Sequence, residues 1–96
     1  MKVVTICGSM KYVEEMKKVS EILAKKNGWC VLQPIYDIDK DKTTKEEFDM
    51  LKQEHFKRIE LSDAIYVVNV DKYLGDSTKI EIEYATKLNK EIFFYE

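Results

Sequence analysis

VVTICGS, residues 3–9, is the stretch that decides the fold of this 96-residue chain. Its first five residues are strand-forming and mostly apolar, and a glycine and a serine follow at once. An uninterrupted run of this kind is typical of a strand that is buried on both faces. A second run, AIYVVNV at residues 64–70, is the most apolar part of the chain. Strands buried on both faces occur in parallel sheets that helices cover on each side, so both runs predict an α/β fold.

Helical patterns alternate with these strands along the chain. The expected order is strand 3–7, helix 11–26, strand 29–32, helix from a Thr43 or Thr44 cap to about Leu61, strand 64–70, helix 77–88 and strand 91–95. Strands that alternate with helices imply right-handed crossovers and a parallel sheet. We therefore expect a single domain over residues 1–96. Its expected fold is a small doubly wound parallel sheet of about four strands (β-α-β-α-β-α-β) in a Rossmann- or flavodoxin-like three-layer sandwich.

Ligands of such sheets bind beyond the carboxyl ends of the strands, where the strand order reverses. The loops expected at that edge are 8–11, 33–43 and 71–78. These loops are therefore the place to look for a site.

Composition excludes several classes of partner and site. Sixteen basic and 18 acidic residues give a net charge of −2, which does not fit a duplex-binding protein. No apolar run approaches the roughly 20 residues that span a bilayer. The expected positions of Cys7 and Cys30, at opposite ends of neighbouring strands, argue against a disulfide. One histidine and no Cys-x-x-Cys give no metal-site spacing, so no metal and no cofactor are expected, in a reduced, cytoplasmic setting.

Glu81 stands out in the third predicted helix. At 100° per residue its position falls inside the arc predicted to be buried, which contains Ile80, Tyr84, Ala85 and Leu88. Glu83 falls outside that arc and faces solvent. An inward carboxylate costs free energy unless it is paired or used, and at the first turn of a helix the dipole favours its ionised form. This pattern fits a nucleophile or a general base.

A capping role is the alternative for Glu81. Thr78-Lys79-Ile80-Glu81 matches a capping box, in which the glutamate accepts from the N–H of the cap residue. Asp76 and Ser77 are competing caps for the same helix.

The single histidine raises a similar choice in the second predicted helix. His55 falls in the middle of an apolar stripe that also contains Phe48, Leu51 and Ile59. A lone histidine on such a stripe is more often a core residue, and the alternative is a ligand contact or a proton shuttle.

Two turns at the expected ligand edge suit a phosphate. Gly8-Ser9-Met10-Lys11 combines a glycine that allows close approach, a hydroxyl, helix N–H groups and a lysine. Gly75-Asp76-Ser77-Thr78 offers a second set of N–H groups at a helix start.

Three segments give the chain a resemblance to the nucleoside 2-deoxyribosyltransferase superfamily, including its small nucleoside-monophosphate N-glycosidases. They are residues 6–11 (ICGSMK), residues 61–68 (LSDAIYVV) and residues 81–85 (EIEYA) followed by Asn89-Lys90. The last segment is the most specific, because the family nucleophile is a glutamate followed by an aliphatic residue and, four positions on, by alanine. The resemblance implies that Glu81 is the nucleophile and that Gly8 and Ser9 contact a 5′-phosphate. It also implies a homodimer or a higher homo-oligomer.

The function expected from the resemblance is cleavage or transfer of the N-glycosidic bond of a nucleotide or nucleoside. Met10, Lys11, Ser77 and Thr78 would help to bind the substrate, with His55 at sugar or base and Tyr36 or Tyr73 stacked on the base. The chain departs from the family at His55, where an aspartate is usual, and at Gly75, where an aspartate or a serine is usual and Asp76 follows one residue later. The alternative is therefore a catalytically inactive module that binds a nucleotide or sugar phosphate. Ribonucleotides and dinucleotide cofactors are alternative substrates.

Overall fold

Four parallel strands make the sheet in the computed structural model, which describes residues 1–96. They are β1 (Val3–Gly8), β2 (Cys30–Leu32), β3 (Ala64–Val68) and β4 (Glu91–Phe94). Their order across the sheet is β2-β1-β3-β4, with β1 in register with both neighbours from Val4↔Val31 and Val4↔Ala64 onward. The strand order therefore reverses beside β1, as in a doubly wound sheet, and the predicted fold class is confirmed.

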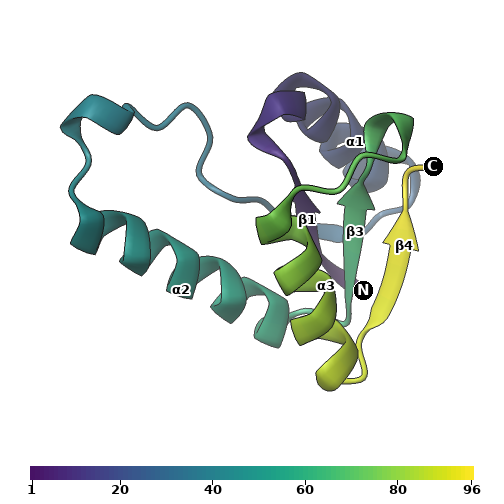
Figure 1. Cartoon of the computed structure of the whole chain (residues 1–96). Coiled ribbons are helices and arrows are strands. Elements are labelled where there is room, and N and C mark those ends of the chain that lie inside the picture. Colours follow the sequence, from purple (N-terminus) through teal and green to yellow (C-terminus); the bar gives the residue numbers. More distant parts are fainter.

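Three α-helices cover the two faces of the sheet (Figure 1). They are α1 (Val13–Lys26), α2 (Lys45–Leu61) and α3 (Asp76–Lys87), and 3-10 turns form η1 (Met10–Tyr12), η2 (Lys40–Lys42) and η3 (Val70–Lys72). The connection through α1 leads away from β3, whereas the connections through α2 and α3 lead the other way across the sheet. Right-handed crossovers therefore place α1 on one face and α2 with α3 on the other, which gives the three layers seen in Figure 1.

The helix ends follow from local chemistry. The Thr44 hydroxyl accepts from the N–H of Glu47 at 3.1 Å, and the Glu47 carboxylate accepts from the N–H of Thr44 at 2.8 Å, a complete capping box. Gly28, at φ 67°, follows the end of α1 in the left-handed region that glycine adopts without strain. No helix of the chain has the length and apolar character to span a membrane.

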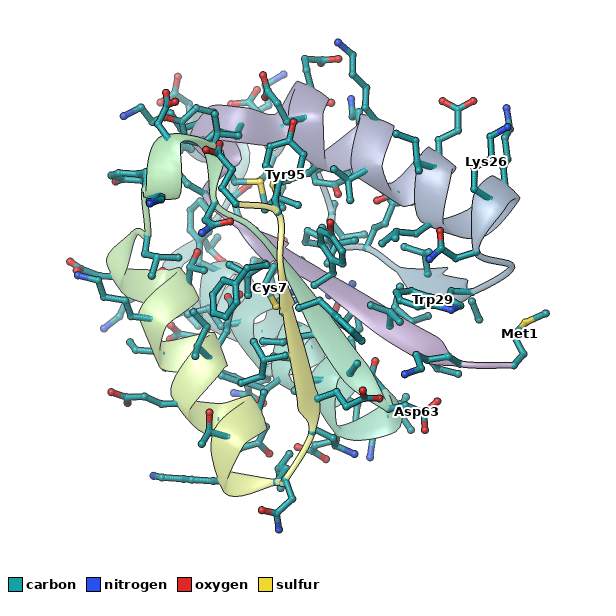
Figure 2. The ribbon with its side chains drawn as sticks, turned by 90° about the vertical axis from the view of Figure 1, so that its right-hand side faces the viewer. Met1, Cys7, Lys26, Trp29, Asp63 and Tyr95 are labelled. Carbon is teal, nitrogen blue, oxygen red and sulfur yellow. The ribbon has the colours of Figure 1, made fainter.

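The side chains of successive residues of β1 point to opposite faces of the sheet, as the pleat of a strand requires. Ile6 packs into the cluster that faces α1, with Met16, Val19, Leu23 and Val68. Cys7 packs into the cluster that faces α2 and α3, with Ile59, Ile65, Val67 and Ala85. Figure 2 shows Cys7 in the interior of the molecule, whereas Met1 and Lys26 lie at its outside. The alternation thus directs the Cys7 thiol toward the helices that carry His55 and Glu81. Cys30 is exposed at the start of β2, and both cysteines are free.

The face that α3 buries differs from the prediction. Ile80 is 54% exposed and Leu88 is 38% exposed, whereas Thr78 and Ala85 are buried. α3 packs against the sheet through these smaller side chains, which rotates the buried arc away from Ile80. Glu81 lies between Thr78 and Ala85 on that arc, at i+3 and i−4, so its inward orientation is confirmed although two of the predicted neighbours were wrong.

The predicted capping box at Thr78 is also wrong. α3 begins at Asp76, with Gly75 as its N-cap, so Thr78 is inside the helix. Neither Asp76 nor Ser77 caps the helix, because the chain enters the helical conformation one residue earlier than they would require. Glu81 is therefore not used as a cap.

Candidate functional site

A cavity of about 380 Å³ opens at the carboxyl edge of the sheet, where the strand order predicts a ligand. The β1–η1 turn, the loop after β2, the inner face of α2 and the first turns of α3 form its walls. It is lined by Gly8, Ser9, Met10, Pro34, Ile35, Ile38, Phe48, Leu51, Lys52, His55, Arg58, Gly75, Asp76, Ser77, Thr78 and Glu81.

Gly8 lets the floor of this cavity form, because the chain passes very close to its neighbours there. A Cβ atom at this position would lie 3.1 Å from the carbonyl oxygen of Val68 and 3.3 Å from the sulfur of Met16. Any side chain at this position would therefore press on these two neighbours. Ser9 then turns the chain into η1, with its hydroxyl accepting from the N–H of Lys11 at 3.2 Å.

The amino end of α3 presents unused donors to the same cavity. Gly75 provides no side-chain cap, and the first intrahelical bond at this end runs from the N–H of Lys79 to Gly75. The N–H groups of Asp76, Ser77 and Thr78 therefore have no partner within the helix. Together with the positive end of the helix dipole, they suit a phosphate or another anion.

Glu81 is on the first turns of α3 with its carboxylate inside the cavity. Its side chain is 17% exposed, and Oε1 lies 3.7 Å from Nε2 of His55. Burial raises the pKa of the Glu81 carboxyl to about 7, and a hydrogen bond with the Cys7 thiol lowers it by a smaller amount. Near neutral pH this carboxyl group is thus divided between its protonated and ionised forms.

His55 contacts three polar groups from three elements. Its Nε2 lies 3.7 Å from Glu81 and 3.7 Å from Sγ of Cys7, while its Nδ1 lies 3.2 Å from Nη1 of Arg58. Burial and the charge of Arg58 lower the pKa of His55 to about 4. His55 is therefore neutral at pH 7, and its contact with Glu81 is a polar contact rather than an ion pair.

Cys7 completes the cluster beneath His55 and Glu81. Burial and the nearby Glu81 carboxylate raise the pKa of the Cys7 thiol well above its usual value, so it remains a thiol. The donor atoms of Cys7, His55 and Glu81 lie within 4.8 Å of one another, a grouping that the local spacing of the sequence did not reveal. A metal-bound histidine normally donates its other ring N–H to an acceptor, whereas Nδ1 here faces a guanidinium that only donates. Arg58 therefore opposes metal binding through Nε2.

Most residues expected in the site lie together. Glu81, His55, both turns at Gly8–Met10 and at Gly75–Thr78 line the cavity. Lys11 and Tyr73 do not line it: Nζ of Lys11 lies 4.4 Å from the ring centroid of Tyr73, so the two pair with each other. Tyr36 packs against the core cluster on the α1 side, with Lys17 over its ring, and lies outside the cavity.

The sequence interpretation did not name one apolar wall of the cavity or its two cations, Lys52 and Arg58. Five of the missed lining residues are apolar: Pro34, Ile35, Ile38, Phe48 and Leu51. Phe48 and Leu51 share the α2 stripe with His55 and could have been found by that spacing. Arg58 is one turn after His55 on the same helix, but a charged side chain on a helix usually indicates a solvated face.

Among the solved structures that match this chain, two resemble nearly its whole length. A 2-desoxiribosyltransferase from Leishmania mexicana matches 99% of this chain with a TM-score of 0.71 and 20% sequence identity. A CMP N-glycosidase from Clostridium botulinum, BcmB, matches 97% of it with a TM-score of 0.58 and 22% identity. This chain spans 64% of the first protein and 67% of the second. The chain therefore shares the fold of these two proteins, which is the fold that the resemblance implied. No protein-family model matches the chain, and no curated protein matches it either.

Proposed function

We propose that this protein cleaves or transfers the N-glycosidic bond of a nucleotide or nucleoside, with Glu81 as the nucleophile. The observation that carries the proposal is the position of Glu81. Its inward carboxylate lies next to His55 in a cavity that the start of α3, with its unused N–H groups, and several apolar side chains also line. Two proteins that share the fold are a deoxyribosyltransferase and an N-glycosidase, which supports this class of reaction.

The cavity has the parts that a nucleotide needs. The N–H groups of Asp76, Ser77 and Thr78 would bind the 5′-phosphate. The apolar wall of Phe48, Leu51 and Ile38 would pack against the base. A nucleotide bound this way has its sugar between the two regions, next to Glu81.

The reaction then follows two displacements. The ionised Glu81 carboxylate attacks the anomeric carbon, the bond from that carbon to the base nitrogen breaks, and the base leaves with the bonding electron pair. Water or a second base next attacks the same carbon and releases Glu81 as a carboxylate, and the proton that the attacking molecule loses passes through solvent to the base that left. Two inversions give net retention at that carbon, as in retaining glycosidases.

A binding module is the second candidate, because His55 replaces the aspartate that is usual in the resembling family. In this case the cavity would bind a nucleotide or a sugar phosphate without breaking a bond. Binding would still raise the melting temperature of the protein.

A screen for free-base release tests both candidates. Purified protein is incubated with paired ribo- and deoxyribonucleoside monophosphates, and the free base is measured by chromatography. Wild type and Glu83→Ala, whose exposed side chain faces solvent, should release base, whereas Glu81→Ala should not. Thermal stabilisation by a nucleotide without any base release would instead support the binding module. Base release that survives in Glu81→Ala would overturn the role of Glu81.

A further inference from the structure

The only histidine and the only arginine of the chain are one helical turn apart on α2, and both line the cavity. Nη1 of Arg58 lies 3.2 Å from Nδ1 of His55. A guanidinium is a donor only and keeps its proton in proteins, so Nδ1 has to be the acceptor. A neutral imidazole with an accepting Nδ1 carries its single proton on Nε2.

We propose that Arg58 is a positioning residue that holds His55 in the Nε2–H tautomer, so that His55 acts as a hydrogen-bond donor to Glu81 and neither as an acid nor as a base. The tautomer follows from the contact with Arg58 alone. The consequence for catalysis rests on the function proposed above.

The surroundings of the ring support this role. The titratable and charged groups around it are Cys7 from β1, Glu81 from α3 and Arg58 from α2, and Lys52 and Asp76 line the same cavity. Burial and Arg58 lower the pKa of His55 to about 4, so the second proton is absent at neutral pH. With Nδ1 accepting from Arg58 and Nε2 protonated, the ring has no free lone pair with which to take a proton.

The proton on Nε2 faces Cys7 as well as Glu81, since Nε2 makes a weak hydrogen-bond contact with Sγ of Cys7 at 3.7 Å. Oε1 of Glu81 lies 3.7 Å from Nε2, longer than a formed hydrogen bond, and such contacts often shorten when substrate binds. A donor at this place stabilises the ionised carboxylate before attack. After attack it faces the ester that Glu81 forms with the sugar.

Nitrogen NMR of the ring tests the tautomer directly, because one histidine gives one set of ring signals. In wild type at pH 7 we expect a protonated Nε2 and an unprotonated Nδ1. Arg58→Met removes the donor, so both tautomers should appear and the pKa of His55 should rise. Lys57→Met removes the same charge from an exposed neighbour and should change neither. An Nδ1–H tautomer in wild type, or an unchanged tautomer in Arg58→Met, would overturn the proposal.

Two substitutions of His55 test its role as a donor. His55→Gln keeps an N–H donor but cannot transfer protons, whereas His55→Leu has neither property. We expect base release by His55→Gln to stay within about tenfold of wild type, and His55→Leu to be slower than His55→Gln by about tenfold or more. Equal loss in both variants would show proton transfer and overturn the donor role.

The two experiments separate this inference from the proposed function. The NMR spectrum needs no substrate and decides the tautomer even if no nucleotide is cleaved. An absence of base release from wild type would overturn the proposed function and the catalytic role of His55 together, and would leave the tautomer decided by the spectrum.

Discussion

Oε1 of Glu81 on α3 and Nε2 of His55 on α2 lie 3.7 Å apart, and burial shifts both groups toward their uncharged forms. The pKa of the carboxyl group is raised to about 7, and that of the imidazole is lowered to about 4. Between these values both groups are mostly neutral. The two shifts should therefore both affect how stability and activity depend on pH.

Stability against pH should show two opposing effects. Glu81 keeps its proton in the folded state up to about pH 7 but loses it near pH 4.5 when unfolded, so its contribution to stability falls as pH rises from 4.5 to 7. His55 stays unprotonated in the folded state down to about pH 4 but binds a proton near pH 6.5 when unfolded, so its contribution falls as pH drops from 6.5 to 4. Each effect amounts to about 3 kcal/mol over its window, and in wild type the two should nearly cancel.

Single substitutions should reveal each effect separately when the free energy of unfolding in urea is measured against pH. Glu81→Gln leaves the histidine effect, so this variant should lose stability on acidification from pH 6.5 to 4.5. His55→Gln leaves the carboxyl effect, so this variant should gain stability over the same range. If both variants kept the pH dependence of stability seen in wild type, the pKa shifts of Glu81 and His55 would be absent.

The rate of base release should also depend on pH, because only the ionised Glu81 can attack. We expect kcat to fall about tenfold for each pH unit below the pKa of Glu81 in the substrate complex and to level off above it. The rate should be measured at saturating substrate, since the substrate phosphate itself titrates near pH 6. A constant kcat from pH 8 to pH 5 would contradict nucleophilic attack by Glu81.

Substitution by alanine should affect the free energy of unfolding differently at Gly8 and at Gly75. A Cβ at Gly8 would lie 3.1 Å from a backbone oxygen that cannot move aside easily, so Gly8→Ala should lower the free energy of unfolding by about 1–3 kcal/mol. At Gly75 the nearest atom would be 3.7 Å away and the backbone φ is −73°, so Gly75→Ala should be tolerated. Equal loss of stability in both variants, measured by urea unfolding, would contradict this difference.

A negative charge at the start of α3 should stabilise the helix but weaken the binding of a phosphate there. Ser77→Asp places a carboxylate near the positive helix end and should stabilise the protein by about 0.3–1 kcal/mol. The same charge should weaken binding of a nucleoside monophosphate by about tenfold or more, while binding of the matching nucleoside changes little. Calorimetry with both ligands checks this, and equal effects on the two would place the phosphate elsewhere.

Part of the site could be predicted because its residues follow local periodicity. His55 shares a stripe with Phe48 and Leu51, so the wheel of α2 correctly turned it inward, although the stripe alone favoured a core residue over one at a cavity. The buried face predicted for α3 was rotated from the observed one. Hydrophobicity alone favoured Ile80 over Thr78 as a buried residue, whereas the helix packs closely through Thr78 and Ala85.

The grouping of Cys7 with His55 and Glu81 could not be predicted from spacing. It depends on the pleat of β1, which points Cys7 toward α2 and α3, and on how these two helices pack on the sheet. Arg58 was missed for a related reason. Its contact with His55 becomes informative only when the inner face of α2 is known to border a cavity.

Mass spectrometry of the protein quenched by acid during turnover tests the role of Glu81 most directly. The nucleotide that releases base fastest is used as substrate, and the tryptic peptide 80–87 is examined, with fragment ions to distinguish Glu81 from Glu83. The account predicts that the sugar phosphate of the substrate is attached to Glu81, and that the adduct is missing from Glu81→Ala. Steady base release with an unmodified Glu81 and a sugar product of inverted configuration would contradict it.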